Sequence, residues 1–147
     1  MNNISVREMT LNDLDSVLDI ENISFTTPWT RESFEKEIKN NQLAKYLVIE
    51  YDNRIIGYGG MWFIIDEAHI TNIAIQREFR NKKLGSFLVR AMIEYAEGLG
   101  IHRMTLEVRE SNIPARRLYE KLGFSPCGKR PKYYQDNNED AIIMWRG

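Results

Sequence analysis

Apolar and polar residues follow two periods along the chain, and these periods predict an order of strands and helices. Apolar side chains at every second position indicate strands, and apolar side chains every three or four positions indicate helices. The pattern predicts strands at residues 4–7, 46–51, 54–65, 69–75, 103–109, 124–129 and 140–145, and helices that begin near residues 11, 30, 84 and 112. The order β-αα-βββ-α-β-α-ββ is typical of an α+β domain around one mixed sheet.

Turn and cap residues mark the ends of these predicted elements. Residues 26–30 break the first helix, and the hydroxyl of Thr30 can cap the second one. Asp52 and Asn53 predict a tight turn between two strands. Three glycines in the long third strand, Gly57, Gly59 and Gly60, predict a bend or a close approach of another part of the chain.

Length, composition and charge limit the class of protein. The 147 residues suit a single domain, 1–147, with 43% hydrophobic and 28% charged residues. A net charge of −1 gives no general attraction to nucleic acid or to a membrane, so neither is expected as a direct partner. No apolar run is as long as a membrane span, and the first residues do not resemble a signal peptide, so we expect a cytoplasmic protein.

The few cysteine and histidine residues exclude two further kinds of site. Cys127 is the only cysteine, which rules out an internal disulfide and suits a reducing compartment. His69 and His102 are far apart in the sequence, and one cysteine with two such histidines does not form a zinc-binding pattern. We therefore expect no metal.

A basic turn lies between the strand that ends at Ile75 and the helix that begins near Leu84. A helix N-terminus surrounded by cations can hold phosphate, and Gly85 would let backbone N–H groups approach a ligand closely. The same pattern is also that of a solvated basic face. Spacing alone leaves both interpretations open. The cations of this turn are Arg77, Arg80, Lys82 and Lys83.

Two residues in the second half could carry proton chemistry. Alternation along residues 103–109 puts Glu107 on the face opposite Met104, Leu106 and Val108, where a carboxylate could accept a proton. From the residues alone, a solvent-facing Glu107 or its ion pair with Arg109 is the favoured interpretation. Tyr119 belongs to an apolar helical stripe, and most tyrosines in such a stripe are structural.

The motifs taken together resemble the GCN5-related N-acetyltransferase (GNAT) superfamily over nearly the whole chain, and within it the branch of bacterial ribosomal-protein-alanine N-acetyltransferases. Each motif alone is modest, but their order along the chain is specific. The closing tyrosine-and-acidic segment indicates the ribosomal-protein branch. The motifs are residues 27–30 (TPWT), 72–75 (NIAI), 80–85 (RNKKLG), 106–112 (LEVRESN), 118–124 (LYEKLGF), 130–134 (RPKYY) and 139–144 (EDAIIM).

The resemblance implies a fold and a reaction. It implies a mixed, mostly antiparallel sheet of six or seven strands, flanked by about four helices, whose fourth and fifth strands splay apart. It implies acetyl-CoA as donor and a protein N-terminal α-amine as acceptor, on a small-subunit ribosomal protein. Glu107 would accept the proton, and Tyr119 would donate one or hydrogen-bond the leaving sulfur. The implied acetyl-CoA site comprises Ile73, Ala74 and Ile75 on the strand, Arg80, Asn81, Lys82, Lys83, Leu84, Gly85 and Ser86 at the turn, and Asn112.

The phosphate turn departs from the superfamily pattern. Asn81 and Lys83 stand where that pattern often has glycine. A Cβ atom at Lys83 would hinder close backbone approach, while its ammonium group could compensate by pairing with a phosphate. We expect this change to alter the affinity for the carrier and not the fold.

The resemblance also implies where the acceptor binds. Trp29 would form one wall, and Tyr133 and Tyr134, expected in a loop, would form another. Acidic side chains nearby could attract a basic protein tail, although simple solvation is the favoured interpretation for them; they are Asp66, Glu67, Asp136, Glu139 and Asp140. Three functions stay open: N-terminal acetylation, acetylation of a lysine side chain or small amine, and a non-catalytic CoA-binding module. A monomer or weak dimer is expected.

Overall fold

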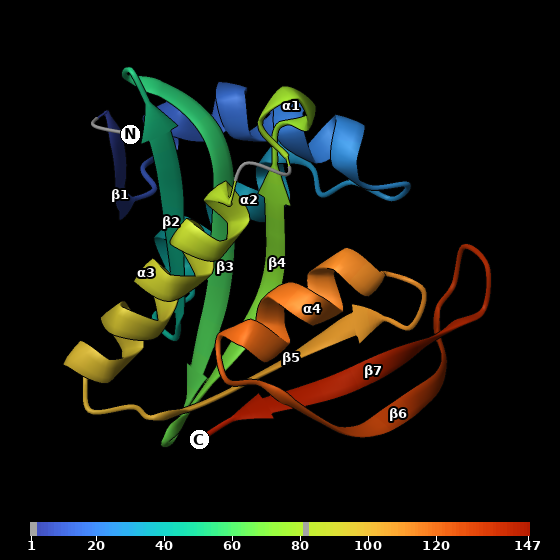
Figure 1. The fold of residues 1–147 in the computed structure, drawn as a ribbon. Helices are drawn as coiled ribbons and strands as arrows, with labels where there is room; N and C mark the ends of the chain where they lie inside the picture. The colour runs from blue at the N-terminus through green and yellow to red at the C-terminus, as the bar shows by residue number, and fades with distance from the viewer. Residues whose placement is uncertain (1–2, 81–82) are drawn as a thin grey trace.

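A computed structural model describes residues 3–80 and 83–147, and in these ranges the chain forms one mixed sheet with helices on both faces (Figure 1). The strands are β1 (Ile4–Glu8), β2 (Ala44–Tyr51), β3 (Arg54–Ile64), β4 (Glu67–Ile75), β5 (Arg103–Arg109), β6 (Ser125–Tyr134) and β7 (Glu139–Arg146). The helices are α1 (Leu14–Ser24), α2 (Arg31–Asn40), α3 (Leu84–Gly98) and α4 (Ile113–Lys121), with 3-10 turns η1 (Leu11–Asp13) and η2 (Arg77–Phe79).

The spatial order of the strands is β1-β2-β3-β4-β5-β7-β6. All neighbours are antiparallel except β4 and β5. The predicted α+β class, the order of elements and the mixed sheet are therefore confirmed. No helix of the described ranges is both long and apolar enough to cross a membrane.

The N-terminal half is an antiparallel meander joined by a short hairpin. Asp52 and Asn53 both have positive φ, 51° and 66°, which matches the twist of the strands that they connect. Thr30 caps α2 by accepting a hydrogen bond from the Ser33 amide at 3.2 Å. Both features agree with the predicted turn and cap.

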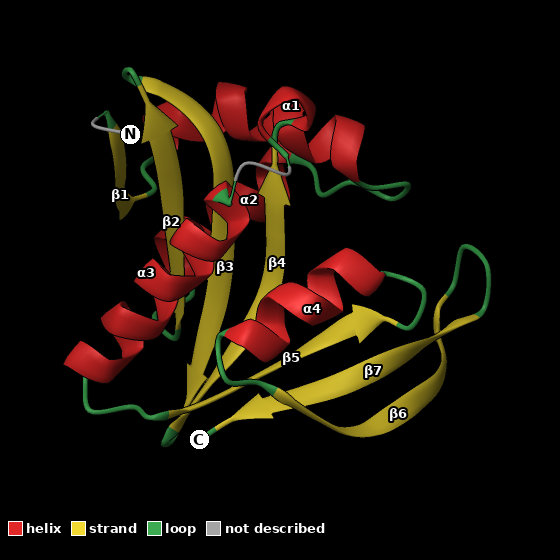
Figure 2. Cartoon of the chain, in the orientation of Figure 1, coloured by secondary structure: helices red, strands yellow, loops and turns green. Residues whose placement is uncertain are grey.

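Two apolar clusters hold the helices against the sheet. Beneath α1 and α2 the cluster includes Leu14, Ile20 and Phe34, all with 0% exposure. On the opposite face α3 contributes Leu88 and Met92, and α4 packs its apolar side against the same cluster. Figure 2 shows α3 and α4 in front of the sheet and α1 and α2 behind it. Full burial of such side chains contributes roughly 1.5–3 kcal/mol each.

All three β3 glycines are needed for close packing, because a Cβ atom on any of them would lie less than 3.0 Å from a neighbouring atom. A Cβ atom on Gly59 would come within 2.7 Å of the Met92 sulfur, and one on Gly60 would collide with the Tyr46 ring. Both contacts lie in the middle of the sheet, where neighbouring side chains have little room to move. The predicted close approach is confirmed.

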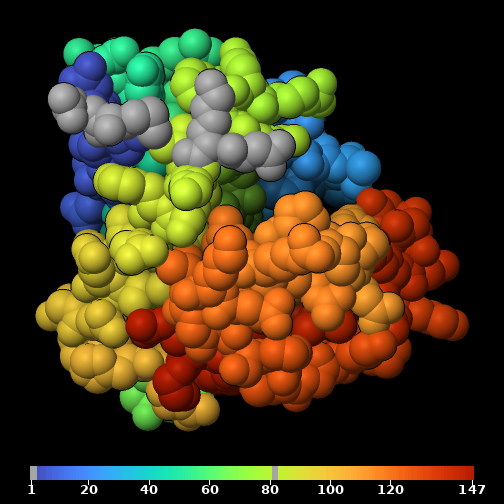
Figure 3. Space-filling model, viewed as in Figure 1, coloured from blue at the N-terminus to red at the C-terminus, as the bar shows by residue number. Residues whose placement is uncertain are grey.

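The sheet opens between its fourth and fifth strands. Pairing of β4 with β5 covers only Glu67 to His69 and Arg103 to Thr105. Beyond these residues β4 continues along β3, whereas β5 continues along β7. The two strands diverge in Figure 1, and in the space-filling view (Figure 3) α4 and the C-terminal strands, orange to red, form a block below the N-terminal part. The predicted splay of strands four and five is confirmed.

One predicted boundary is wrong. Tyr133 and Tyr134 were expected in a loop, but β6 continues to Tyr134, and the turn comes after it. An irregular register between Arg130 and Tyr134 lets the strand extend, with Lys132 at φ 53° and its amide donating to Asp140 Oδ1 at 3.0 Å. Alternation alone does not show such an irregularity, because the local backbone changes its pairing there.

Candidate functional site

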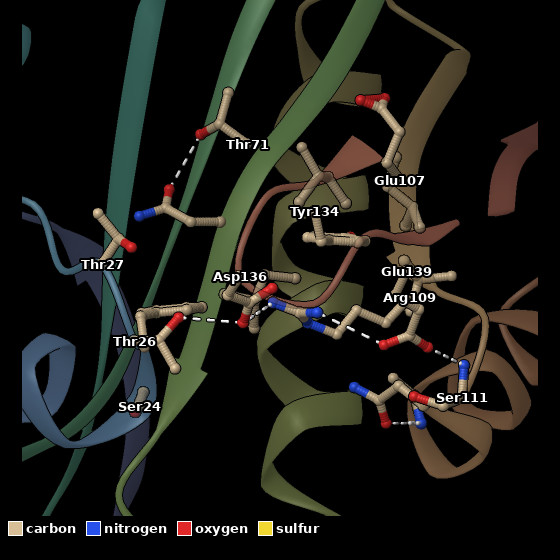
Figure 4. A pocket seen from close by; sticks show the side chains of 18 of the residues that line it. Ser24, Thr26, Thr27, Thr71, Glu107, Arg109, Ser111, Tyr134, Asp136 and Glu139 are labelled. Atoms are coloured by element: carbon tan, nitrogen blue, oxygen red, sulfur yellow. Dashed lines mark hydrogen bonds and ion pairs between the residues drawn. The ribbon is translucent and has the colours of Figure 1, made fainter. Parts of the chain in front are cut away.

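A cavity of about 800 Å³ fills the wedge between the diverging strands (Figure 4). Its walls come from the second half of β4, the second half of β5, the start of α4, the segment after α1 and the β6–β7 turn. Segments far apart in the sequence therefore surround one space. The lining includes both predicted catalytic residues, Glu107 and Tyr119.

The backbone of β4 presents polar groups to this wedge. The Gln76 amide donates to Ile56 on β3 at 2.7 Å, so strand alternation directs the backbone of Ala74 toward β3 and that of Ile73 and Ile75 toward the wedge. The Ile75 carbonyl accordingly accepts a hydrogen bond from Arg80 Nε at 2.9 Å. An extended molecule with amide groups could pair with this open edge as a further strand does.

Arg80 links the end of β4 to the end of α1. Besides the bond to Ile75, its Nη2 donates to Ser24 Oγ at 3.2 Å. The side chain is thus held beside the wedge, with a cation at the turn that precedes α3. Its role toward a phosphate stays a prediction, and Asn81 and Lys82 lie outside the described residues.

The start of α3 is built by four residues of the predicted phosphate turn. Lys83 is the N-cap, with φ 64° and ψ 14°, which is the left-handed region that favours glycine. Leu84 buries its side chain in the core at 3% exposure, so only its backbone can face a ligand. A Cβ atom on Gly85 would lie 3.3 Å from Leu118 Cδ1, so this glycine lets α3 approach α4. Ser86 follows in the first turn of the helix.

We expect Lys83→Gly to separate the two effects of this lysine. Removing the left-handed strain should stabilise the fold by about 1 kcal/mol at most, because glycine also gains freedom in the unfolded chain. Loss of the ammonium group should make the binding of acetyl-CoA less sensitive to salt. Chemical denaturation and calorimetric titration at two salt concentrations measure the two effects. The control is Lys132→Gly, because Lys132 also has a positive φ, 53°. An equal change in the salt dependence of acetyl-CoA binding in this control would contradict the role given to the Lys83 ammonium group.

Glu107 projects from β5 into the cavity, half-buried. Its Oε1 accepts a hydrogen bond from the Tyr133 hydroxyl at 3.5 Å. The suggested ion pair between Glu107 and Arg109 is not formed, because Arg109 turns instead to Asp136 and Glu139. Glu107 therefore keeps one carboxylate edge directed at the cavity, as a proton acceptor requires.

Tyr119 reaches the same cavity from α4. Its ring packs edge-on against Phe124 with centroids 5.7 Å apart. In the described part of the chain its hydroxyl has no hydrogen-bond partner. Burial, with a smaller effect of Tyr134, raises the pKa of Tyr119 to about 12, so the phenol stays protonated near neutral pH. It is a hydrogen-bond donor that is available to a ligand.

Asn112 and Ser111 form the entry to α4. The Asn112 side chain caps the helix by accepting a hydrogen bond from the Ala115 amide at 3.3 Å, and the Ser111 amide donates to Glu139 Oε2 at 2.6 Å. Asn112 lines the cavity, but its cap already uses the side-chain oxygen. A contact between Asn112 and the carrier stays a prediction.

Trp29 is placed differently from the other predicted acceptor residues. Its ring packs on Phe34, with centroids 5.3 Å apart, and lies near Tyr46. Among described residues the cavity lining contains Ser24, Phe25, Thr26 and Thr27 from this segment and Tyr134 from β6, but neither Trp29 nor Tyr133. Trp29 thus anchors the segment, and its direct contact with an acceptor stays a prediction.

A buried carboxylate holds that anchor. Glu21 is 3% exposed, its Oε2 accepts a hydrogen bond from the Trp29 amide at 2.8 Å, and the Tyr58 hydroxyl donates to Oε1. Burial raises the pKa of Glu21, although the Trp29 amide opposes the shift. The carboxylate is therefore costly to ionise in the folded state.

We expect Glu21→Gln to remove a pH dependence of stability. Because the folded pKa lies above the ordinary value of 4.5, the wild type loses stability as pH rises from that value through the folded pKa. The free energy of unfolding of the variant should therefore increase relative to that of the wild type as pH rises from 4 to 8. Urea unfolding at several pH values measures the difference. If the difference in free energy of unfolding between variant and wild type stayed constant over this range, the raised pKa would not belong to Glu21.

The sequence interpretation missed the ion pairs around the β6–β7 turn. Arg109, Asp136 and Glu139 form ion pairs beside the cavity, and Thr26 joins Asp136 from the opposite wall. Alternation did place Arg109 on the same face as Glu107. Its partners come from residues that look like ordinary surface acids in the sequence, so only the fold brings them together.

The comparison with known proteins decides the family. A sequence model described as the Acetyltransferase (GNAT) family matches residues 14–124, which is more than half of the chain. The chain belongs to this acetyltransferase family. The expected fold and the expected class of enzyme are thereby confirmed, and GNAT acetyltransferases use acetyl-CoA as their donor.

Relatives of similar length support the same family. A candidate ribosomal protein bS18-alanine N-acetyltransferase of Bacillus subtilis (strain 168) is 50% identical, covering 96% of this chain and 93% of its own. The ribosomal protein bS18-alanine N-acetyltransferase of Salmonella typhimurium (strain LT2) is 36% identical, covering 98% and 96%. The crystal structure of the ribosomal-protein-S18-alanine N-acetyltransferase from Escherichia coli superimposes with a TM-score of 0.88 at 29% identity, covering 97% and 92%.

Proposed function

We propose that this GNAT acetyltransferase transfers the acetyl group of acetyl-CoA to the α-amine of a ribosomal protein N-terminus, with alanine as the first residue. The observation that carries the proposal is the similarity, over nearly the full length of both chains, to enzymes named for that acceptor. A ribosomal substrate places the reaction in the cytoplasm. One chain, 1–147, supplies all the residues proposed for the site, so a monomer is sufficient.

The wedge suits acetyl-CoA in three respects. The open edge of β4, at Ile73 and Ile75, can pair with the amide groups of the pantetheine arm. The N-terminus of α3, with Lys83 as its cap and Arg80 beside it, suits the pyrophosphate. The cavity of about 800 Å³ is lined by Ile73 at the open edge and by Glu107 and Tyr119 on the opposite side. Bound acetyl-CoA would supply the thioester that the acceptor attacks.

The acceptor amine needs only a modest base. An α-amine has a pKa of about 7.7–8.0, so a fair fraction is uncharged at neutral pH, whereas a lysine side chain has a pKa of about 10.4. In the proposed step the amine nitrogen bonds to the acetyl carbon, Glu107 takes the amine proton directly or through water, and the carbon–sulfur bond breaks. Backbone N–H groups of β4 would stabilise the charge on the acetyl oxygen.

Tyr119 would act on the leaving sulfur. Its pKa of about 12 is well above the roughly 8.5 of a thiol, so full transfer of its proton to the thiolate is unfavourable. A hydrogen bond from the phenol to the sulfur lowers the cost of the departing charge without that transfer.

The test compares acceptors that differ only in the amine offered. A synthetic peptide with a free N-terminal alanine, the same peptide N-terminally blocked but carrying a lysine, and spermidine are incubated with isotopically labelled acetyl-CoA. We expect label on the free N-terminus at least tenfold faster than on the other two. Equal rates on the blocked peptide or on spermidine would favour the alternative acceptors. Binding of acetyl-CoA without transfer to any of them would favour a non-catalytic module.

A further inference from the structure

Arg109 lies at the end of β5, two residues beyond Glu107 and on the same face of the strand. Its Nη2 donates to Asp136 Oδ2 at 2.9 Å, and its Nη1 reaches Asn137 Oδ1 at 3.2 Å and Glu139 Oε1 at 3.4 Å. These three partners all belong to the β6–β7 turn and the start of β7. One guanidinium therefore fastens the whole turn to β5 (Figure 4).

The same guanidinium also fixes an aromatic ring of the cavity wall. Its Cζ lies 4.0 Å from the centroid of the Tyr134 ring, which is the distance of a stacked cation–π contact. Tyr134 in turn packs edge-on against Tyr133 at 5.1 Å, and the Tyr133 hydroxyl reaches Glu107. Through these contacts Arg109 helps to fix Tyr134 and Tyr133, the residues around the proposed base.

The turn that Arg109 holds touches the opposite wall of the wedge. Asp136 Oδ2 accepts a hydrogen bond from Thr26 Oγ1 at 3.1 Å, across 110 positions of sequence. The Asp136 carboxylate is partly shielded from water, which raises its pKa, but the bonds from Arg109 and Thr26 prevail and lower it. Asp136 therefore remains ionised and able to hold both partners.

We infer that Arg109 is a positioning residue, which holds the Tyr134–Glu139 segment against Thr26 and so sets the width of the acceptor entrance. The inference rests on the proposed function, because it concerns the acceptor of that reaction. A flexible peptide end must pass between these two walls to bring its amine to Glu107. Fixed walls orient the peptide before it reacts. Mobile walls would have to become ordered when the peptide binds, and this loss of entropy would weaken peptide binding. Within the described residues, the hydrogen bonds and the ring contact of Arg109 all go to the β6–β7 side of the wedge, away from β4 and α3.

The variant Arg109→Gln removes the positive charge and the planar, fork-shaped set of guanidinium N–H donors. We expect the KM for an alanine-terminated peptide to rise about tenfold, while kcat stays within threefold and the dissociation constant of acetyl-CoA within twofold. Arg109→Lys keeps the charge but offers no planar fork and stacks poorly, so it should recover only part of the loss. Either a peptide KM within twofold of the wild type in Arg109→Gln, or an equal loss of acetyl-CoA affinity, would overturn the inference.

The control is Arg103→Gln, on the same strand and away from the cavity. Arg103 has the same two kinds of contact: it pairs with Glu67 at 3.1 Å and lies 4.8 Å from the centroid of the Trp145 ring. This variant should keep the wild-type peptide KM. If the peptide KM of Arg103→Gln also rose tenfold, the effect would be a general one of losing a surface arginine, and the inference would be overturned.

Amide hydrogen exchange provides a measurement that does not depend on activity. Exchange of residues 133–139 should become at least tenfold faster in Arg109→Gln and stay unchanged in Arg103→Gln. Unchanged exchange in Arg109→Gln would overturn the inference. If the wild type acetylates no peptide N-terminus while the exchange difference persists, the proposed function fails, and so does the acceptor role of Arg109, whereas its hold on the turn is confirmed.

Discussion

Glu107→Gln is expected to lower kcat for an alanine-terminated peptide at pH 7 by about 10²-fold or more, in the range usual for loss of a general base. The substitution keeps the size of the side chain and the acceptor oxygen for Tyr133, which lies 3.5 Å from Oε1. It removes only the group that takes the proton. The affinity for acetyl-CoA should therefore stay within about twofold of the wild type, since the pantetheine would pair with β4.

The pH profile makes this prediction sharper. Below the α-amine pKa of about 7.7–8.0 the acceptor is mostly charged and the base is most needed, so the deficit should shrink as pH rises above 8. Steady-state rates from pH 6 to 9.5 measure this. Glu110→Gln is the matched control, because Glu110 pairs with Lys129 outside the cavity lining. Wild-type rates for Glu107→Gln at every pH would show that the base lies elsewhere.

The second large effect is expected for Tyr119→Phe, with kcat reduced about 10- to 100-fold. This range corresponds to the loss of one hydrogen bond to a charged group, roughly 1.5–3 kcal/mol. The ring should keep its contact with Phe124, and the fold should change little, because the hydroxyl has no partner among the described residues. Single-turnover rates with saturating acetyl-CoA separate the chemical step from binding.

The leaving group tests the role assigned to Tyr119. An acetyl thioester whose thiol has a lower pKa leaves more easily, so the deficit of Tyr119→Phe should shrink with such a donor. Because the pKa of Tyr119 is about 12, the wild type should show no loss of rate from its ionisation below about pH 10. Tyr95→Phe serves as control, since its hydroxyl contacts Glu8 outside the cavity lining. A deficit independent of the leaving group would contradict a bond to the sulfur.

Local features of the fold could be predicted because short-range rules govern them. The turn at Asp52 and Asn53, the cap at Thr30 and the strand of residues 103–109 each depend on residues close in sequence. The end of β6 could not be predicted in this way. Its irregular register depends on Asp140 of the neighbouring strand, which accepts the Lys132 amide.

The candidate site likewise has features that the sequence could predict and features that it could not. Period-two alternation put Glu107 on an open face of its strand, and the motifs around it indicated the GNAT superfamily. Neither could show that Arg109 pairs with the β6–β7 turn and not with Glu107, because ion pairs between distant segments depend on how the strands diverge. Trp29, proposed as a wall, packs its ring on Phe34 of α2, and its contact with an acceptor stays a prediction.

By itself, the sequence determined the α+β class, the order of the elements, the acetyltransferase resemblance and the set of candidate residues, since these follow from local periodicity and motif spacing. The tertiary structure alone decided which of these residues share a cavity and which contacts they make there. The physical reason is that β4 leaves β5 after His69 to follow β3, while β5 follows β7. That divergence opens the wedge and brings Thr26, Arg109 and Asp136 together across it.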